Sequence, residues 1–238
     1  MLSGYSFFSL HEQWSLCMPT RAVALNERTD HAKKIVALLR AAYPRSRTAL
    51  DYSTPLELLV ATMLSAQCTD KKVNEVTKSL FKKYRNVQDF ASARQEALEQ
   101  DVRQTGFFRN KARHIIAAAQ RLCSAYGGTV PDTMEALISL PGVARKTANI
   151  VLANAFNKAV GIAVDVHVKR LAGRLGLSSQ INTDKIEQDI MALLPRQDWI
   201  DFNHLIVDHG RTVCIARKPR CPVCVLRCIC PSACVLQD

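Results

Sequence analysis

The sequence predicts an all-α protein, on three observations. Apolar residues recur at the three- and four-residue spacing of one helix face along most of the 238-residue chain. Proline and glycine interrupt these segments at short intervals, as helix boundaries do. No stretch alternates apolar and polar residues as a half-buried strand does, and the run at 161–164 is too short to build a sheet.

The predicted helices follow an N-terminal tail. Residues 1–28 show no clear period, so we expect them to be mobile. Asp30 can cap the first helix, whose apolar residues share one face until Pro44 ends it. Residues 54–57 (Thr-Pro-Leu-Glu) are a capping box with proline at the first helical position, and they open an apolar helix that reaches Ala66. Further helices are expected at residues 70–84, 93–103, 109–126, 132–139, 145–156, 166–175, 184–194 and 199–210.

The charge balance indicates a polyanionic partner. Lys and Arg total 32 against 21 Asp and Glu, which gives a net charge of +11. Nucleic acid is the first expectation and an anionic membrane surface the second, while a merely basic globular protein remains the plain alternative. A hydrophobic content of 48% is ordinary for a globular domain. No stretch approaches the roughly 18 apolar residues of a membrane span, so a membrane-inserted protein is not expected.

The cysteines are concentrated near the C-terminus, where six of the nine lie within the final 25 residues. Four of them have the spacing C-x6-C-x2-C-x5-C, which is typical of a Zn²⁺ site or an iron–sulfur cluster: Cys214, Cys221, Cys224 and Cys230. Cys228 is an alternative to Cys230 as the fourth ligand. The chain start lacks the basic region of a signal peptide, so we expect a reducing compartment rather than export.

Two segments are suited to contact phosphates. Residues 140–149 end one helix, turn through Pro-Gly and start another, which leaves free amides at the positive end of a helix. A helix–hairpin–helix that anchors a DNA backbone has this pattern, and so does an ordinary corner between two helices. The second segment lies between the cysteines and carries Arg217, Lys218 and Arg220.

An aspartate follows the hairpin. Residues 162–168 form an apolar run that brings Asp165 to the start of a helix. Taken alone, this aspartate is most simply interpreted as an N-cap.

In this order and spacing, the hairpin, the aspartate and the four cysteines resemble the endonuclease III family of DNA glycosylases, over about residues 30–230. Residues 64–70 (Leu-Ser-Ala-Gln-Cys-Thr-Asp) and 106–112 (Gly-Phe-Phe-Arg-Asn-Lys-Ala) also resemble segments of that family, where they form loops that enter the DNA. The resemblance implies that Lys146 is the nucleophile and that Asp165 is its catalytic partner.

The resemblance implies the remaining site residues as well. The cysteine spacing matches the family's ligands, which favours a [4Fe–4S] cluster over zinc and Cys230 over Cys228. Gln67 matches a glutamine that fills the gap left by the extruded nucleotide, and Phe107, or alternatively Phe108, stands where the family has an apolar wedge. The expected DNA contacts elsewhere are Gly142, Ala144, Arg145, Arg217, Lys218 and Arg220.

Two positions depart from the family pattern. The hairpin usually has a second glycine where this chain has Ala144, which weakens phosphate anchoring if that position needs a positive φ and is neutral otherwise. A threonine usually precedes the position of His167, and here it is Val166, so one hydroxyl contact is missing.

By the same resemblance, the protein has two helical domains that flank a DNA-binding cleft. A six-helix barrel with the helix–hairpin–helix covers 48–158, and a discontinuous iron–sulfur cluster domain covers 29–47 and 159–238. The expected partner is double-stranded DNA with damaged bases or abasic sites. We further expect a monomer that acts in the bacterial cytoplasm, associated with the nucleoid through DNA.

The implied chemistry is base excision followed by strand cleavage. Lys146 attacks the sugar C1′ of a flipped nucleotide, expels the base and forms a Schiff base, and β-elimination cuts the strand on the 3′ side. An ordinary lysine with a pKa of about 10.4 is only about 0.1% neutral near pH 7.4. We therefore expect burial, Arg145 and the helix start to favour the neutral amine. Asp165 is expected to take the proton or to support positive charge on the sugar.

Three alternatives remain. An adenine-excising relative without lyase activity usually lacks a lysine at position 146. A glycosylase that prefers pyrimidine dimers is not separable by motifs. A non-catalytic, zinc-stabilised DNA-binding module would keep the charge, hairpin and cysteines but leave the pairing of Lys146 with Asp165 a coincidence.

Overall fold

A computed structural model describes residues 25–233 of the chain. Over these residues the secondary structure is helical, with no strand, as the sequence predicts. Most of the predicted tail, together with Cys17 and Cys234, lies outside the described residues. None of the helices between 25 and 233 is long and apolar enough to cross a bilayer.

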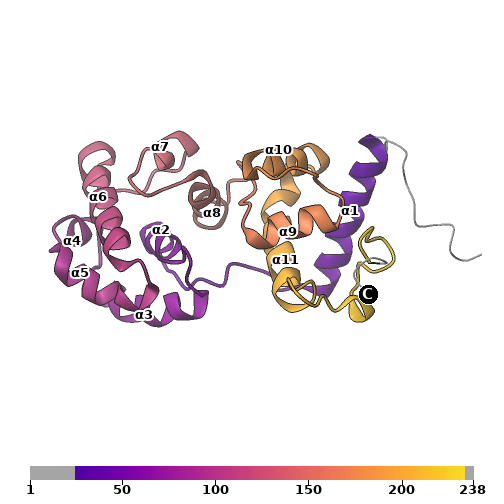
Figure 1. Cartoon of the computed structure of the whole chain (residues 1–238). Coiled ribbons are helices and arrows are strands. Elements are labelled where there is room, and N and C mark those ends of the chain that lie inside the picture. Colours follow the sequence, from indigo (N-terminus) through magenta and orange to yellow (C-terminus); the bar gives the residue numbers. More distant parts are fainter. Residues whose placement is uncertain (1–24, 234–238) are drawn as a thin grey trace, which may run out of the picture.

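The helices form two lobes that lie side by side (Figure 1). The first lobe contains α2 (Pro55–Leu64), α3 (Asp70–Lys83), α4 (Val87–Ala91), α5 (Gln95–Val102), α6 (Phe108–Tyr126), α7 (Met134–Ile138) and α8 (Arg145–Phe156), with the 3₁₀ turn η1 (Arg103–Thr105). The second lobe contains α1 (Leu25–Ala42), α9 (Val166–Arg174), α10 (Thr183–Leu193) and α11 (Trp199–Thr212), with the 3₁₀ turns η2 (Arg196–Asp198) and η3 (Cys221–Val223). The second lobe is therefore built from both ends of the described chain.

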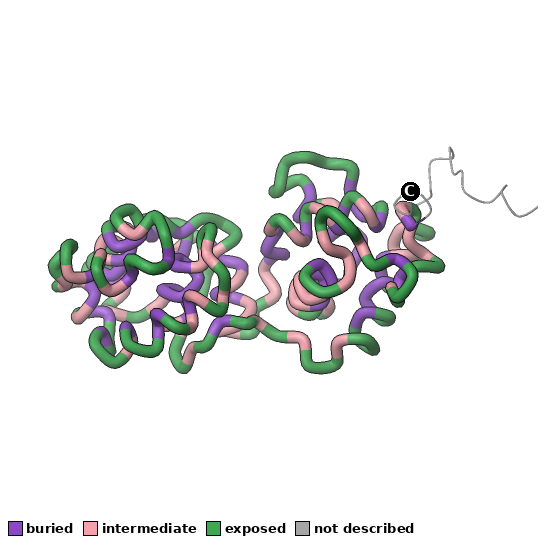
Figure 2. Tube along the Cα trace, turned by 60° about the horizontal axis from the view of Figure 1, so that its bottom comes forward, coloured by how far each residue is buried: buried purple, intermediate pink, exposed green. Residues whose placement is uncertain are grey.

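Each lobe has its own hydrophobic core. The buried apolar residues separate into one cluster between Leu50 and Leu152 and another that joins α1 to residues 162–226. Figure 2 shows the buried positions gathered inside each lobe. Phe90 is fully buried in the first core and Phe202 in the second. Because each core closes on its own residues, the surface between the lobes is left for polar side chains.

Local sequence signals account for most helix ends. Thr54 accepts a hydrogen bond from the Glu57 backbone N–H at 3.2 Å, and Glu57 in turn accepts one from the N–H of Ser53 at 2.6 Å, so the predicted capping box forms one residue wider than expected. Gly127 ends α6 in a left-handed conformation with φ 60°.

Two expectations about helices were wrong. The first helix begins at Leu25 rather than after Asp30, so the tail assigned to 1–28 overlaps its first turn. The helix α4 was not predicted, because five residues are too few to show a period. Its signal is a capping box in which Asn86 and Asp89 bond each other's backbone N–H groups.

Candidate active site

Lys146 and Asp165 line one groove between the two lobes. Its volume is about 490 Å³, and it is lined from the first lobe by residues around Gln67 and by α8, and from the second by residues 163–167 and the face of α11 that carries Arg211. Lys146 is the second residue of α8, and Asp165 immediately precedes α9. The two residues predicted to act together are thus brought to one groove from different cores. We call this space the interlobe groove.

Asp165 uses one carboxylate oxygen as the N-cap of α9. Its Oδ1 accepts the backbone N–H groups of His167 and Val168, both at 2.8 Å. No residue in the described part of the chain bonds Oδ2. The capping interpretation and a role in the groove are therefore compatible, because each requires a different oxygen.

Lys146 is exposed, and no described residue pairs with its amine. Its neighbour Arg145 is paired with Glu187 of α10, with Nε and Oε2 2.7 Å apart. Two of the features expected around this amine, burial and an unpaired neighbouring arginine, are therefore not found in the structure.

Arg145 was also expected to contact DNA, and in the structure its guanidinium joins the two lobes. Glu187 is buried, and it accepts Asn149 Nδ2 at 2.8 Å and the Ile162 N–H at 3.1 Å as well. The hydrogen bond to Glu187 raises the pKa of Arg145. The Arg145 side chain is still 45% exposed, and its backbone N–H lies in the first turn of α8, which has no side-chain cap, so a contact with a phosphate remains a prediction.

The hairpin tolerates alanine at position 144 but requires glycine at 142. Gly142 has φ 78°, and a Cβ added there would lie 2.6 Å from Cβ of His114. Ala144 has φ −87° and ψ 166°, an extended conformation that any residue adopts. The departure from the family glycine therefore leaves the hairpin geometry intact.

The two residues predicted to enter DNA have left-handed backbones. Gln67 has φ 53° and Phe107 has φ 48°. The Phe107 side chain is 63% exposed, whereas Phe108 packs against the first core. Phe107 is therefore the ring that projects. Gln67, Phe107 and Gly142 line a second hollow of about 190 Å³, which we call the insertion pocket.

The four predicted ligand cysteines lie close together at the end of the second lobe. Cys221 is buried, and Cys214, Cys224 and Cys230 are half-buried, while the spare Cys228 is exposed. Burial, and then the neighbouring thiols, raise the pKa of both Cys224 and Cys230. Between residues 25 and 233, no three ligand-type side chains converge tightly enough to hold a single metal ion.

The sulfurs already receive hydrogen-bond donors. A guanidinium nitrogen of Arg174 lies 3.3 Å from Sγ of Cys214, and the Leu226 N–H lies 3.4 Å from Sγ of Cys224. Such donors favour thiolate sulfur, so the residues present fit a thiolate-ligated group.

Comparison with known proteins agrees with this geometry. Residues 60–196 match the model of the HhH-GPD superfamily base excision DNA repair proteins. Endonuclease III of Synechocystis sp. is 48% identical over 206 residues, 87% of this chain and 94% of that relative, and endonuclease III of Bacillus subtilis is 42% identical over 79% of this chain and 86% of that relative. The solved structure of a trapped endonuclease III–DNA covalent intermediate is 38% identical, covers 88% of this chain and 99% of its own, and superposes with a TM-score of 0.85.

The chain belongs to the HhH-GPD superfamily of base excision DNA repair proteins. Its all-helical, two-lobed fold is that of its endonuclease III relatives. Among these relatives are the bacterial proteins named above.

Sequence reasoning missed the arginines that hold the cationic loop of this HhH-GPD protein. Arg217, Lys218 and Arg220 are exposed on the loop that follows Cys214. Arg170 donates to the Cys214 carbonyl at 3.0 Å, and Arg174 donates to the carbonyls of residues 215 and 216 at 2.9 and 2.8 Å. The available signal was the spacing of Arg170 and Arg174, which places both on one face of the helix after Asp165.

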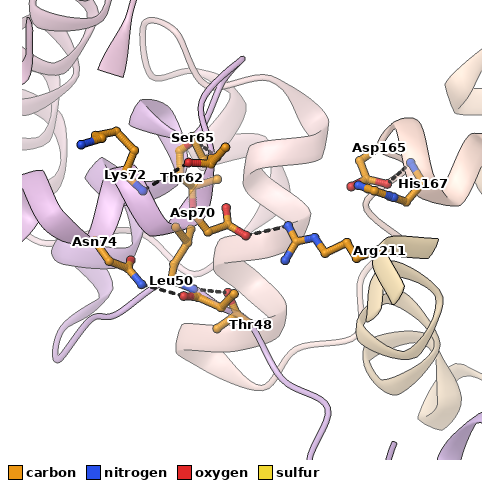
Figure 3. Close-up of polar contacts among 12 residues, drawn as sticks. Thr48, Leu50, Thr62, Ser65, Asp70, Lys72, Asn74, Asp165, His167 and Arg211 are labelled. Atoms are coloured by element: carbon orange, nitrogen blue, oxygen red, sulfur yellow. Dashed lines mark hydrogen bonds and ion pairs between the residues drawn. The ribbon is translucent and has the colours of Figure 1, made fainter. Parts of the chain in front are cut away.

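A second missed contact crosses the groove. Asp70, the first residue of α3, pairs with Arg211 of α11 at 2.6 Å (Figure 3). Figure 3 shows this pair reaching between the lobes beside Asp165 and His167. Nothing in the sequence relates two residues 141 positions apart.

Proposed function

We propose that this enzyme of base excision repair is a bifunctional DNA glycosylase and abasic-site lyase in which Lys146 is the nucleophile. The observation that carries the proposal is that an exposed lysine at a helix start and a carboxylate line the same groove, and that neither the amine nor Oδ2 of the carboxylate has a partner within residues 25–233. The lesions we expect are oxidised pyrimidines in double-stranded DNA.

The reaction begins when the damaged nucleotide leaves the stack and enters the interlobe groove. The neutral amine of Lys146 attacks C1′ of the sugar, the C1′–N bond breaks and the base departs with its electron pair. The attached amine loses one proton, the C1′–O4′ bond breaks as O4′ takes up a proton, and a protonated Schiff base remains. Abstraction of a proton from C2′ then expels the 3′ phosphate by β-elimination. Asp165 Oδ2 would take the lysine proton or stabilise positive charge on the sugar.

DNA is proposed to lie along the side of the molecule that carries the groove, the insertion pocket and the cationic loop. Gln67 would fill the gap in the duplex, and Phe107 would unstack the neighbouring step. Phosphates would meet the amides after Gly142 and Ala144 and the side chains of the cationic loop, Arg217, Lys218 and Arg220.

The cysteines are proposed to hold a [4Fe–4S] cluster. A zinc ion would need sulfurs about 3.8 Å apart, from tetrahedral bonds of about 2.3 Å, whereas each cysteine of a cluster binds a separate iron. The spacing of the four cysteines, C-x6-C-x2-C-x5-C, supports the cluster, because it matches the ligand spacing of the family that the sequence resembles. When bound, the cluster supplies bonds that cross-link the C-terminal chain, and Arg174 orients Cys214 and the cationic loop.

The two cores support the proposed domain division, 48–158 for the barrel and 29–47 with 159–238 for the cluster domain. Because the proposed substrate is damaged DNA, the protein is proposed to act at the nucleoid in the bacterial cytoplasm. The proposed active form is the monomer.

Borohydride trapping on DNA with an abasic site tests the nucleophile. The reduced Schiff base should give a covalent complex with the native chain and none with Lys146→Gln. Lys169→Gln is the matched control, because Lys169 is an exposed lysine on α9 outside the groove lining, and it should trap normally. A native chain that binds abasic DNA but is never trapped would lack the lyase activity, and its release of the damaged base would then separate a glycosylase without lyase activity from a non-catalytic DNA-binding module.

Asp165→Asn tests the carboxylate separately from the cap. Asparagine caps a helix as well as aspartate does, so folding stability should hold within about 0.5 kcal/mol. Base excision should fall by on the order of a hundredfold, since the charge in the groove is lost. Native turnover in this variant would contradict the assignment.

Comparing an oxidised pyrimidine with a pyrimidine dimer in the same duplex separates the two substrate classes.

A further inference from the structure

We infer that Lys111 is a positioning residue that couples the two loops predicted to enter DNA, an inference that rests on the proposed function. Lys111 lies in the first turn of α6 and is only 6% exposed. Its Nζ donates to the Leu64 carbonyl at 2.8 Å and to the Thr105 carbonyl at 2.7 Å. No carboxylate in the described part of the chain pairs with it.

The two carbonyls that Lys111 binds are the last ones of two helical elements. Leu64 ends α2 and Thr105 ends η1. Carbonyls at helix C-termini lack intrahelical partners and carry partial negative charge, so a cation stabilises both ends at once. Gln67 follows Leu64 by three residues, and Phe107 follows Thr105 by two. One ammonium therefore fixes the starting point of both loops.

Both loops contain a strained residue immediately after that point. Gln67 and Phe107 are two of the three non-glycine residues with positive φ in residues 25–233, and the third, Asn157, simply ends α8. Such conformations persist only where the surrounding structure holds them, and they gather at functional positions. Lys111 lines the insertion pocket together with both residues.

Burial lowers the pKa of Lys111, so the ammonium is desolvated at a cost that its hydrogen bonds to the two carbonyls offset. Methionine of similar shape would avoid the desolvation but would leave both carbonyls without this donor. What the ammonium adds is a fixed link between two loops that are 40 residues apart. Because one ammonium is hydrogen-bonded to the start of both loops, Gln67 and Phe107 should enter the duplex in a single concerted step.

The test measures insertion without chemistry. The full-length chain is bound to a duplex that carries a stable tetrahydrofuran abasic analogue, with 2-aminopurine as the base opposite it. Insertion unstacks 2-aminopurine and raises its fluorescence. Gln67→Ala and Phe107→Ala should each reduce that rise, and Lys111→Met should reduce it part of the way toward the level of the Gln67→Ala/Phe107→Ala double variant.

Coupling is measured by repeating the two alanine changes in the Lys111→Met background. In the native background the effects of Gln67→Ala and Phe107→Ala should be non-additive, and in the Lys111→Met background they should add. Cleavage of a duplex abasic site, relative to the same site in a single strand, should fall on the order of tenfold in Lys111→Met. A merely stabilising lysine would leave this ratio and the coupling unchanged, and that result would overturn the inference.

The outcomes separate this inference from the proposed function. If the native chain inserts Gln67 and Phe107 into the duplex and this insertion depends on Lys111, but borohydride does not trap the chain on DNA, then the lyase assignment fails while the coupling stands. If it is trapped and Lys111→Met inserts normally, the coupling is wrong. Should Lys111→Met lose its helical circular dichroism, Lys111→Gln replaces it, since the shorter amide keeps donors but cannot span both carbonyls.

Discussion

The ion pair between Arg145 and Glu187 holds α8 against the second lobe, and its contribution to the free energy of unfolding can be predicted. Glu187 is 4% exposed, and its carboxylate is approached so closely that a Cβ on Gly161 would lie 2.1 Å from Oε1. Oε1 accepts hydrogen bonds from Asn149, from the Ile162 N–H and, at 3.3 Å, from Nη2 of Arg145, while Oε2 accepts one from Nε of Arg145. Arg145 is the one cation among these three partners, so Arg145→Ala removes the countercharge and leaves the bonds from Asn149 and Ile162 in place.

The expected magnitudes follow from burial. Arg145→Ala leaves the Glu187 carboxylate buried without a countercharge, a change that costs about 3–5 kcal/mol for a fully buried pair. The Arg145 side chain is 45% exposed, so solvent screening reduces this to about 2–3 kcal/mol. Adding Glu187→Gln removes the stranded charge but keeps an oxygen for Asn149 and Ile162. The double variant should therefore be about 1 kcal/mol more stable than Arg145→Ala alone.

Urea unfolding of the four proteins in the cycle measures these differences. The reasoning fails if Arg145→Ala costs less than about 0.5 kcal/mol, or if Glu187→Gln destabilises the Arg145→Ala background as it does the native one. Arg145→Ala should also slow borohydride trapping, because the neighbouring Lys146 is carried by the same helix turn.

Three further changes have definite outcomes. Gly142→Ala should lower the free energy of unfolding by about 1–3 kcal/mol, measured by chemical denaturation, because φ is 78° and the new Cβ would lie 2.6 Å from a histidine side chain. Ala144→Gly should change it by no more than about 0.5 kcal/mol. Equal losses in the two variants would refute the hairpin geometry. Cys230→Ser should remove the absorbance at about 400 nm expected of an iron–sulfur cluster, and Cys228→Ser should keep it. The reverse result would show that Cys228 is the fourth ligand. Burial lowers the pKa of His204, so below about pH 6.5 the unfolded state binds a proton that the folded state does not, and the free energy of unfolding should fall as the pH drops. His204→Gln should reduce this dependence on pH. An unchanged dependence would mean that other groups cause it.

Local signals made most of the helices predictable. Caps and glycine stops depend on a few adjacent residues, so predicted ends such as those of α6 and α8 agree with the structure to within one residue. The start of α1 was misplaced because Asp30 was interpreted as a cap. The buried stripe that includes Ala32 and Ile35 holds the helix against α11 regardless of where a cap stands, so the helix extends further.

The lysine and aspartate proposed to be catalytic could be singled out in the sequence because each lies in a short motif, but the groups that hold the site together could not. Glu187 reaches Arg145 across 42 residues, and Lys111 reaches Leu64 across 47. Such pairs depend on how two helices approach in space, and no local period or cap reports that approach. A lysine within a helical pattern is usually solvated, so only burial distinguishes Lys111 from its neighbours.

Asp165 shows why a structural and a catalytic interpretation of one residue need not compete. A carboxylate has two oxygens, and the two 2.8 Å bonds to Oδ1 fix its plane at the start of α9. An anion held in this way does not have to reorient when positive charge develops on a bound sugar, which is the condition for effective electrostatic stabilisation. The cap therefore supplies the preorganisation that the catalytic role needs. The same N-cap signal that made Asp165 look ordinary in the sequence is the reason its other oxygen can act.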